Sequence, residues 1–275
     1  MSEYLQYDFF RYALAGVILI SVCAAVIGTY IITRRYVAIS GGITHACFGG
    51  LGLGYFLGIN PVVMAGVFAV GSSVGVEWMS RRFRLREDSA IAVIWGVGMA
   101  LGVLFVFLTP GYVPELNAFL FGNILTVSAS DLLWLAAFTV VLLVFVAMQW
   151  RNIVAVSFDR DYAEVSGLPV KFVTYAMTVL VAVDIVLSIR LAGIMMIISM
   201  LSLPIITAEI FSHKYMRVLL LAVVFALVSS VGGLFLSTVI DVPCSALIVL
   251  LMAALFCVCR LAKAISGCKL PKNNS

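Results

Sequence analysis

Residues 12–33 read YALAGVILISVCAAVIGTYIIT, a run without a single charged side chain. A helix needs about 20 apolar residues to cross the ~30 Å hydrocarbon core of a bilayer, so this run is long enough to span a membrane. The rest of the chain has the same character, since 64% of its 275 residues are hydrophobic and 11% are charged. A soluble chain could not cover that much apolar surface. The sequence therefore predicts an all-α, polytopic membrane bundle, and its continuously apolar segments argue against a β-barrel.

Further apolar segments follow the first, and we expect eight or nine transmembrane helices in one domain that covers residues 1–275. The boundary between the sixth and the seventh segment has no polar turn and is marked by Arg190 alone. A break at this point would allow Asp184 to pair with Arg190. The nine segments lie at about 12–33, 42–59, 61–80, 89–109, 131–150, 171–189, 191–210, 216–237 and 244–261.

The basic residues predict the orientation of the chain. Lys and Arg are enriched in cytoplasmic loops, and an alternating path through nine spans puts nearly all of the 17 Lys and Arg on one side. We therefore predict an outside N-terminus and a cytoplasmic C-terminus, and the net charge of +4 reflects this topology, not nucleic-acid binding. Arg11 and Arg190 lie on the outer side, and the inner side holds Arg34, Arg35, Arg81, Arg82, Arg84, Arg86, Arg151, Arg160, Lys171, Lys214, Arg217, Arg260, Lys263, Lys269 and Lys272.

One histidine lies in a glycine-rich apolar segment. Residues 40–50 read SGGITHACFGG, with His45 at the centre. A polar ring inside hydrocarbon must face a cavity, a partner or a ligand. The flanking glycines leave room for close approach and for irregular backbone, so we expect this segment to lie deep in the bundle beside a central path.

Small residues recur every fourth position in three of the predicted spans. Such stripes let transmembrane helices approach closely, and tight packing is the plainest interpretation of each. The stripes are Gly50–Gly54–Gly58, Ala92–Gly96–Ala100 and Ser229–Gly233–Ser237.

Two connections are longer than turns. Residues 110–130, on the outer side, are too apolar for a solvated loop, so we predict a re-entrant or interfacial segment. Residues 151–170, on the cytoplasmic side, contain a short helix pattern in which Ser157 or Asp159 caps the start and Gly167 with Pro169 ends it. Such a helix suits the docking of a protein partner, and a solvated connector is the alternative.

The sequence lacks the motifs of several enzyme classes. We find no GxxxxGK[ST] phosphate loop, no GxSxG and no HExxH, so we expect a chain that does not bind ATP in that way, is not an enzyme and holds no cofactor of its own. Glu77 is predicted to reach water at the cytoplasmic end of its span. The charges from Arg81 to Asp88 are accounted for by the preference of basic residues for the cytoplasmic side.

Three stretches resemble the permease subunits of ABC importers for zinc, manganese and iron(II). The first runs from Arg34–Arg35 to Thr44–His45–Ala46, and the second spans residues 80–125 with its Pro110–Gly111–Tyr112 and Phe121–Gly122–Asn123 motifs. The third runs from residue 157 to residue 170, and a later apolar block, residues 193–208, is also similar to the family. The similarity keeps the same order from about Tyr7 to Leu261.

The resemblance implies a function for these stretches. His45 would be a ligand of the transported metal, with Thr44 and Cys47 as weaker neighbours, although Gly41 stands where many members carry an aspartate. The cytoplasmic segment would face an ATPase through Asp159, Tyr162, Glu164, Gly167 and Pro169.

The resemblance also implies partners and a location. They are two cytoplasmic ABC ATPase subunits that bind the ATP, an extracytoplasmic metal-binding protein, membrane lipid and a second copy of the chain, in a bacterial cytoplasmic membrane. Which of the three metals is carried stays open.

Other functions remain open on the residues themselves. An ion-coupled secondary transporter would use intramembrane acids, and Asp184 is the clearest mid-span acid, but we see no internal repeat. An intramembrane enzyme would need clustered Asp, Glu or His, which the sequence does not provide. A permease for metal chelates would need a wide, aromatic-lined cavity.

Overall fold

The computed structural model describes residues 7–110, 122, 124 and 127–265. Within these ranges all the long secondary-structure elements are helices and no strand occurs, so the predicted all-α fold is confirmed. The helices are α1 (Asp8–Thr33), α2 (Ala38–Leu57), α3 (Pro61–Phe83), α4 (Glu87–Leu108), α6 (Ala129–Phe158), α7 (Arg160–Val165), α8 (Val170–Met200), α9 (Leu203–Glu209), α10 (Tyr215–Ile240) and α11 (Cys244–Ile265).

Seven helical stretches of the described residues are long and apolar enough to cross a membrane. They are α1, α3, α4, α6, α10, α11 and the continuous stretch Val170–Glu209 that contains α8 and α9. α2, which we predicted as the second span, falls outside this set because glycines, hydroxyl residues and His45 dilute its apolar composition. The predicted re-entrant segment lies largely outside the described residues.

The stretch Val170–Glu209 bends at Gly193, not at Arg190 as predicted. Gly193 has φ 76° and ψ 164°, a backbone conformation that side chains disfavour. Gly122 packs against the bend, and a Cβ added to Gly122 would lie 2.5 Å from the carbonyl carbon of Ala192. The position of the break is therefore decided by glycine geometry and by a distant contact.

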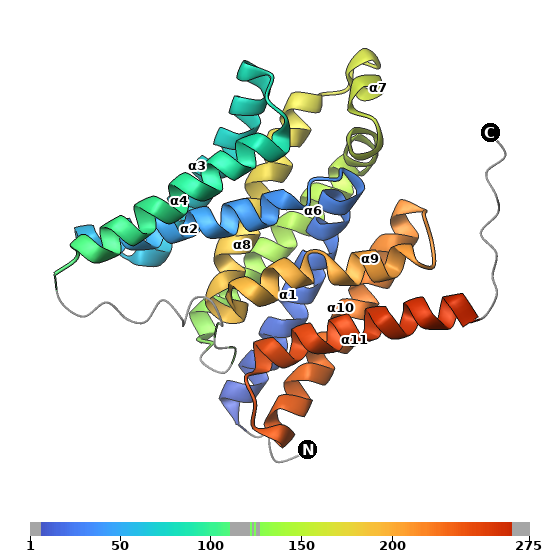
Figure 1. Cartoon of the computed structure of the whole chain (residues 1–275). Helices are drawn as coiled ribbons and strands as arrows, with labels where there is room; N and C mark the ends of the chain where they lie inside the picture. The colour runs from blue at the N-terminus through green and yellow to red at the C-terminus, as the bar shows by residue number, and fades with distance from the viewer. Residues whose placement is uncertain (1–6, 111–121, 123, 125–126, 266–275) are drawn as a thin grey trace.

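α1 and the α8–α9 stretch lie at the centre of the molecule (Figure 1). Burial covers 72% of the most apolar window of α1 and 67% of that of Val170–Glu209. The corresponding share is 17% for both α4 and α11, whose outer faces are left to lipid or to another chain. Figure 1 shows α2, α3 and α4 running together away from this centre, with α10 and α11 as a pair on the other side.

Glycines join α2, α3 and α4 at backbone distance. A Cβ added to Gly98 of α4 would lie 2.6 Å from the Cα of Ala46 on α2, and one added to Gly54 of α2 would lie 2.6 Å from the Cα of Pro61 on α3. Real Cβ atoms do not approach other atoms this closely, so only hydrogen fits at these positions. The three helices therefore form one tightly packed unit, which we call the α2–α4 unit.

Two of the three small-residue stripes pack in part as predicted, and Gly58 is the exception, because it caps the end of α2 and an added Cβ would meet nothing within 4 Å. Gly50 and Gly54 face α3, and Gly233 faces α11, where an added Cβ would lie 3.0 Å from the Cα of Ile248. The stripe of Ala92, Gly96 and Ala100 differs, because it lies on an exposed face of α4 while Gly98 and Gly102 make the contact with α2.

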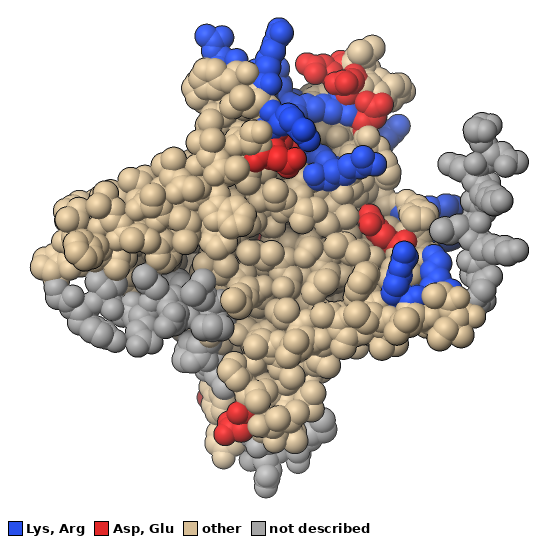
Figure 2. Space-filling model, viewed as in Figure 1, with Lys and Arg blue, Asp and Glu red and all other residues tan. Residues whose placement is uncertain are grey.

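Charged side chains gather at one end of the molecule (Figure 2). This end holds the C-terminal ends of α1 and α3, the start of α4 and the short helix α7. A second, smaller group of charges lies lower in this view, toward the right, and most of the remaining surface carries almost no charge. The separation fits a protein whose apolar middle lies in lipid.

Candidate functional site

His45 lies half-buried on α2 and stacks on Trp95 of α4. The two ring centroids are 4.5 Å apart and the ring planes differ by 6°. Gly41, one helical turn before His45, makes room for the indole, because a Cβ at this position would lie 3.8 Å from the Trp95 ring. None of the described residues hydrogen-bonds to the imidazole, so its nitrogens remain available to a ligand.

Thr44 and Cys47 point away from His45. Both are buried, and the Thr44 hydroxyl donates a hydrogen bond to the backbone carbonyl of Ser40. Cys47 lines a small apolar pocket with Val62 and Val186, on the side of α2 that faces α3 and α8. The three candidate ligands therefore point to different sides of α2, and neither Thr44 nor Cys47 lies beside the imidazole of His45.

No group of three or more His, Cys, Asp or Glu side chains that could hold a metal ion occurs among the described residues. A metal ion placed at His45 would therefore have one protein ligand among the described residues, and its other ligands would have to come from elsewhere. Gly41 provides no side chain one turn away, where an aspartate would add a carboxylate.

The predicted short helix is present as α7. The carboxylate of Asp159 caps it by accepting a 2.9 Å hydrogen bond from the backbone N–H of Tyr162. Gly167 follows the helix with φ 73°, and Pro169 stands just before α8. α6 continues to Phe158, however, so the predicted connector 151–170 is helical on both sides of Asp159.

One face of α7 is exposed and the other is anchored. Tyr162 is 67% exposed and Val165 is 89% exposed, and Glu164 lies on the same outer side. Ala163 is fully buried, and the side chain of Arg160 turns back into the protein. A short helix that presents an apolar and an aromatic residue to water is suited to contact a protein partner.

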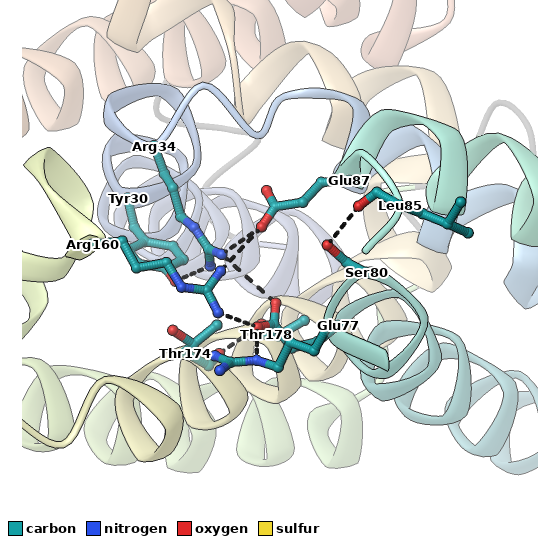
Figure 3. A network of polar contacts seen from close by, with 10 residues as sticks. Tyr30, Arg34, Glu77, Ser80, Leu85, Glu87, Arg160, Thr174 and Thr178 are labelled. Carbon is teal, nitrogen blue, oxygen red and sulfur yellow. Dashed lines mark hydrogen bonds and ion pairs between the residues drawn. The ribbon is translucent and has the colours of Figure 1, made fainter. Parts of the chain in front are cut away.

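Five charged residues meet behind α7, and we call them the charge cluster (Figure 3): Arg34, Glu77, Arg81, Glu87 and Arg160. Glu77 is completely buried, and its Oε1 accepts hydrogen bonds from Arg81 Nε at 2.6 Å and from Arg160 Nη2 at 3.0 Å. Glu87 Oε1 accepts from Arg34 Nη2 at 2.8 Å and from Arg160 Nη1 at 3.4 Å. The cluster thus joins the ends of α1, α3, α4 and α7.

Local backbone geometry aims Arg34 into the charge cluster. Arg35 adopts φ 57°, and the N–H of Tyr36 then donates a 2.8 Å hydrogen bond to the carbonyl of Ile31, which closes the end of α1. The guanidinium of Arg34 consequently lies 4.9 Å from the centre of the Tyr36 ring and donates a 2.8 Å hydrogen bond to the hydroxyl of Tyr30.

Burial and neighbouring charge act in opposite directions on Arg34. Burial alone would lower its pKa, but Tyr30, Glu87 and Glu77 favour the charged form and raise the pKa above its ordinary value. Burial, with Glu87 as a second cause, raises the pKa of Tyr36. Arg34 therefore stays cationic and Tyr36 neutral at physiological pH.

The charge cluster was not predicted from the sequence. We predicted that Glu77 reaches water, which is wrong, because three arginines from different segments enclose it. Arg81 and Glu77, four residues apart on one helix, are the one local signal. The predicted Asp184–Arg190 pair is also wrong: Arg190 Nη1 lies 2.8 Å from Asp131, and Asp184 is buried.

Comparisons with known proteins cover almost the whole chain. The sequence profile described as the ABC 3 transport family matches residues 6–263. A probable metal transport system membrane protein of Chlamydia pneumoniae is 37% identical over 84% of this chain and 81% of its own length. The manganese transport system membrane protein MntC of Listeria monocytogenes is 29% identical over 92% of this chain and 90% of its own length.

A solved structure supports the same relationship. The chain is similar to one in PsaBC from Streptococcus pneumoniae in complex with Fab, with a TM-score of 0.81, 26% identity and coverage of 94% of both chains. The family indicated by the motifs around His45 and Gly167 is thus confirmed by sequence and by fold. This chain belongs to the ABC 3 transport family.

Proposed function

We propose that this chain is the membrane permease of an ATP-driven importer that moves a divalent transition-metal ion, namely zinc, manganese or iron(II), into a bacterial cytoplasm. The observation that carries the proposal is the family match over residues 6–263, supported by relatives whose names include manganese and metal transport. The chain binds no ATP in this proposal, and separate cytoplasmic ABC ATPase subunits provide the energy. An extracytoplasmic metal-binding protein delivers the ion.

His45 is the metal ligand we propose. Imidazole nitrogen suits zinc and iron(II), whereas manganese would need oxygen ligands beside it, and a transport site needs few and weak ligands so that the ion can leave. The stack on Trp95 holds the ring in one orientation at the edge of the α2–α4 unit. Thr44 and Cys47 stay weaker candidates, since α2 would have to rotate or unwind to bring them beside His45.

The orientation we propose has the N-terminus outside and the C-terminus in the cytoplasm. The charged end of the molecule then lies in the cytoplasm, as the preference of Lys and Arg for that side requires. With α2 counted as a span and the bend at Gly193 as a turn, the chain crosses nine times within a single domain, residues 1–275.

The exposed face of α7 is the ATPase contact we propose, with Asp159, Tyr162, Glu164, Gly167 and Pro169 as its residues. We expect Val165→Glu to lower co-purification of the ATPase subunit about 10-fold or more, because it places a charge at the centre of an apolar contact. The measurement is the ratio of the two subunits after affinity purification of the permease.

Val239→Glu is the matched control for this experiment. Val239 is 78% exposed in the last turn of α10, at the end opposite α7, so its charge should leave the ratio unchanged. Equal co-purification with Val165→Glu and with the unchanged chain would exclude α7 as the contact.

We further propose that two copies of the chain form the permease. The exposed stripe of Ala92, Gly96 and Ala100 leaves a flat face on α4, next to Trp95 and therefore next to His45. Flat faces of small residues are typical of helix pairs in membranes. A second copy on this face would bring two His45 side chains to one path.

If two copies pair through this face of α4, Gly96→Leu should yield monomers, because the leucine side chain would prevent the two helices from approaching closely. Gly71→Leu on α3 is the control, since an added Cβ meets nothing within 4 Å at either glycine. Mass photometry of the detergent-solubilised protein distinguishes the two states. A Gly96→Leu variant that remains dimeric would show that the two copies meet on a different face.

A secondary transporter is the alternative, and one observation favours it. Asp184 is 1% exposed in the middle of α8, and its Oδ1 has no hydrogen-bond partner among the described residues. Buried acids of this kind serve ion coupling in carriers. Liposomes that contain this chain alone decide the matter: uptake of Mn²⁺ or Zn²⁺ without an ATPase supports the carrier, and uptake that requires the ATPase and ATP supports the importer.

A further inference from the structure

We propose that the charge cluster is the joint through which α7 moves the α2–α4 unit, and that Glu77 is the positioning residue at its centre. The inference rests on the proposed function, because it takes α7 as the contact with the ATPase. It assigns a role in transport to Glu77, Arg160, Arg34, Arg81 and Glu87, none of which we placed in the metal path or on the ATPase contact.

The geometry singles out Arg160 as the link. α7 packs mainly on α6 and α8. Arg160, its first residue, extends past them to Glu77 on α3 at 3.0 Å and to Glu87 on α4 at 3.4 Å. A displacement of α7 is therefore transmitted to both helices through one guanidinium group, whose planar donors hold two carboxylates at once.

Burial makes this link stiff. Glu77 is fully buried and the side chains of Arg160 and Glu87 are each 28% exposed, so water screens the contacts of Arg160 only in part. Loss of Arg160 would cost Glu77 a 3.0 Å charge-assisted hydrogen bond, while Arg81 at 2.6 Å and Arg34 at 3.6 Å would remain beside the carboxylate. Moving α7 without α3 would separate Arg160 from Glu77, and the two helices are accordingly expected to move together.

The charge cluster also has unused hydrogen-bonding capacity. Glu77 Oε2, Arg81 Nη2 and the Thr174 hydroxyl are buried without a hydrogen bond among the described residues. Glu77 Oε2 already lies 3.6 Å from Arg34 Nη2, beyond hydrogen-bond distance but within reach of a small shift. The Glu77 carboxylate can therefore exchange a hydrogen bond with Arg160 for one with Arg34 and still be paired with a positive charge. A joint that has two arrangements requires such an exchange.

The α2–α4 unit carries this movement to His45. Gly98 and Gly54 hold α4 and α3 against α2 at backbone contact, so the three helices cannot slide independently. Glu87 begins α4, and Trp95, two turns later on the same helix, stacks on His45. A push on Arg160 thus reaches the proposed metal ligand through two tightly packed helices.

The test uses the permease purified with its ATPase subunit and reconstituted in liposomes, with Mn²⁺ and Zn²⁺ as probes. We expect Arg160→Gln to retain the ATPase subunit and its hydrolysis of ATP, and to lower the metal transported per ATP by about 10-fold, a size typical of coupling between sites. Arg160→Lys, which keeps the charge but loses the two-pronged contact, should give an intermediate ratio. Arg86→Gln is the control, because Arg86 is exposed, lies beside Glu87 and makes no ion pair among the described residues.

A double-mutant cycle tests whether Glu77 acts through Arg160. Glu77→Gln should lower the same ratio, and Glu77→Gln combined with Arg160→Gln should be no worse than the more severe single variant. Independent, additive losses would overturn the joint. If Glu77→Gln does not insert or fold, Arg160→Gln and Arg160→Lys decide the question alone.

Different results would contradict the proposed function and the role of the charge cluster. If the unchanged chain neither retains an ATPase nor moves Mn²⁺ or Zn²⁺, the proposed function is wrong. If it does both, and Arg160→Gln keeps the unchanged ratio of metal to ATP, the charge cluster is a structural contact and the inference is overturned.

Discussion

Replacing His45 with alanine is expected to abolish metal uptake while leaving membrane insertion and ATPase assembly intact. Ligand removal should lower uptake by at least ~100-fold, the upper range for loss of a group that supports a bound metal. The fold should tolerate the change, because His45 is half-buried at the edge of α2 and makes no hydrogen bond to the described residues. The measurement is uptake of Mn²⁺ and Zn²⁺ by cells or liposomes that contain the complete transporter.

The chain offers a matched control for this prediction. It contains two histidines, and the second, His213, is exposed in the turn between α9 and α10. His213→Ala should transport as well as the unchanged protein. His45→Cys adds a finer test, because a thiolate prefers softer ions and should shift selectivity from Mn²⁺ toward Zn²⁺. Unchanged uptake by His45→Ala would remove this residue from the metal path.

Replacing Gly98 with valine is expected to prevent the α2–α4 unit from packing. The Cβ of any side chain at this position would lie 2.6 Å from the Cα of Ala46, and backbone cannot move aside as a flexible side chain can. Overpacking of this kind typically destabilises a protein by about 1–3 kcal/mol, and we expect the upper end of that range or beyond. The measurement is the melting temperature and the share of monodisperse protein after solubilisation.

Gly71→Val separates the packing effect from the general effect of a β-branched residue in a helix. Gly71 lies on an exposed face of α3, and an added Cβ meets nothing within 4 Å. This variant should keep nearly the full stability, since valine and glycine differ little in intrinsic helix preference. Equal stability of the two variants would contradict the backbone contact between α2 and α4.

The sequence predicted the features that depend on neighbouring residues. Long apolar runs marked most of the membrane helices, because a bilayer imposes their length. The start of α7 at Asp159 and its end before Gly167 followed from capping chemistry, which acts within one helical turn. The segment around His45 was recognised as unusual because polar side chains are rare in apolar runs.

The features that depend on distant residues were missed. Arg34, Glu77, Glu87 and Arg160 are far apart in the chain, and no local pattern shows that they meet. Taken singly, each charge at a helix end was explained by access to water, and that explanation failed once three arginines enclosed Glu77. The pairing of Arg190 with Asp131 instead of Asp184 has the same cause.

The bend in Val170–Glu209 shows how a local signal can be misplaced. Arg190 was taken as the separator because it is a basic residue between two apolar runs, yet a charge does not oblige a helix to bend. Gly193 permits the bend, since φ 76° and ψ 164° are accessible to glycine, and the backbone of Gly122 packs against it. The contact between these two glycines joins segments that are far apart in the chain, so no local pattern marks Gly193 as the position of the bend.

The glycine contacts of the α2–α4 unit also restrict how this protein can evolve. On the outward faces of α3 and α4, positions such as Val67 and Val103 are more than half exposed, and one apolar residue can replace another with little effect. Gly54, Gly98 and Gly102 have no such alternatives, because even a methyl group would collide with a neighbouring backbone. Among descendants of this sequence, drift should therefore accumulate on the surface that faces lipid, while these three positions stay unchanged.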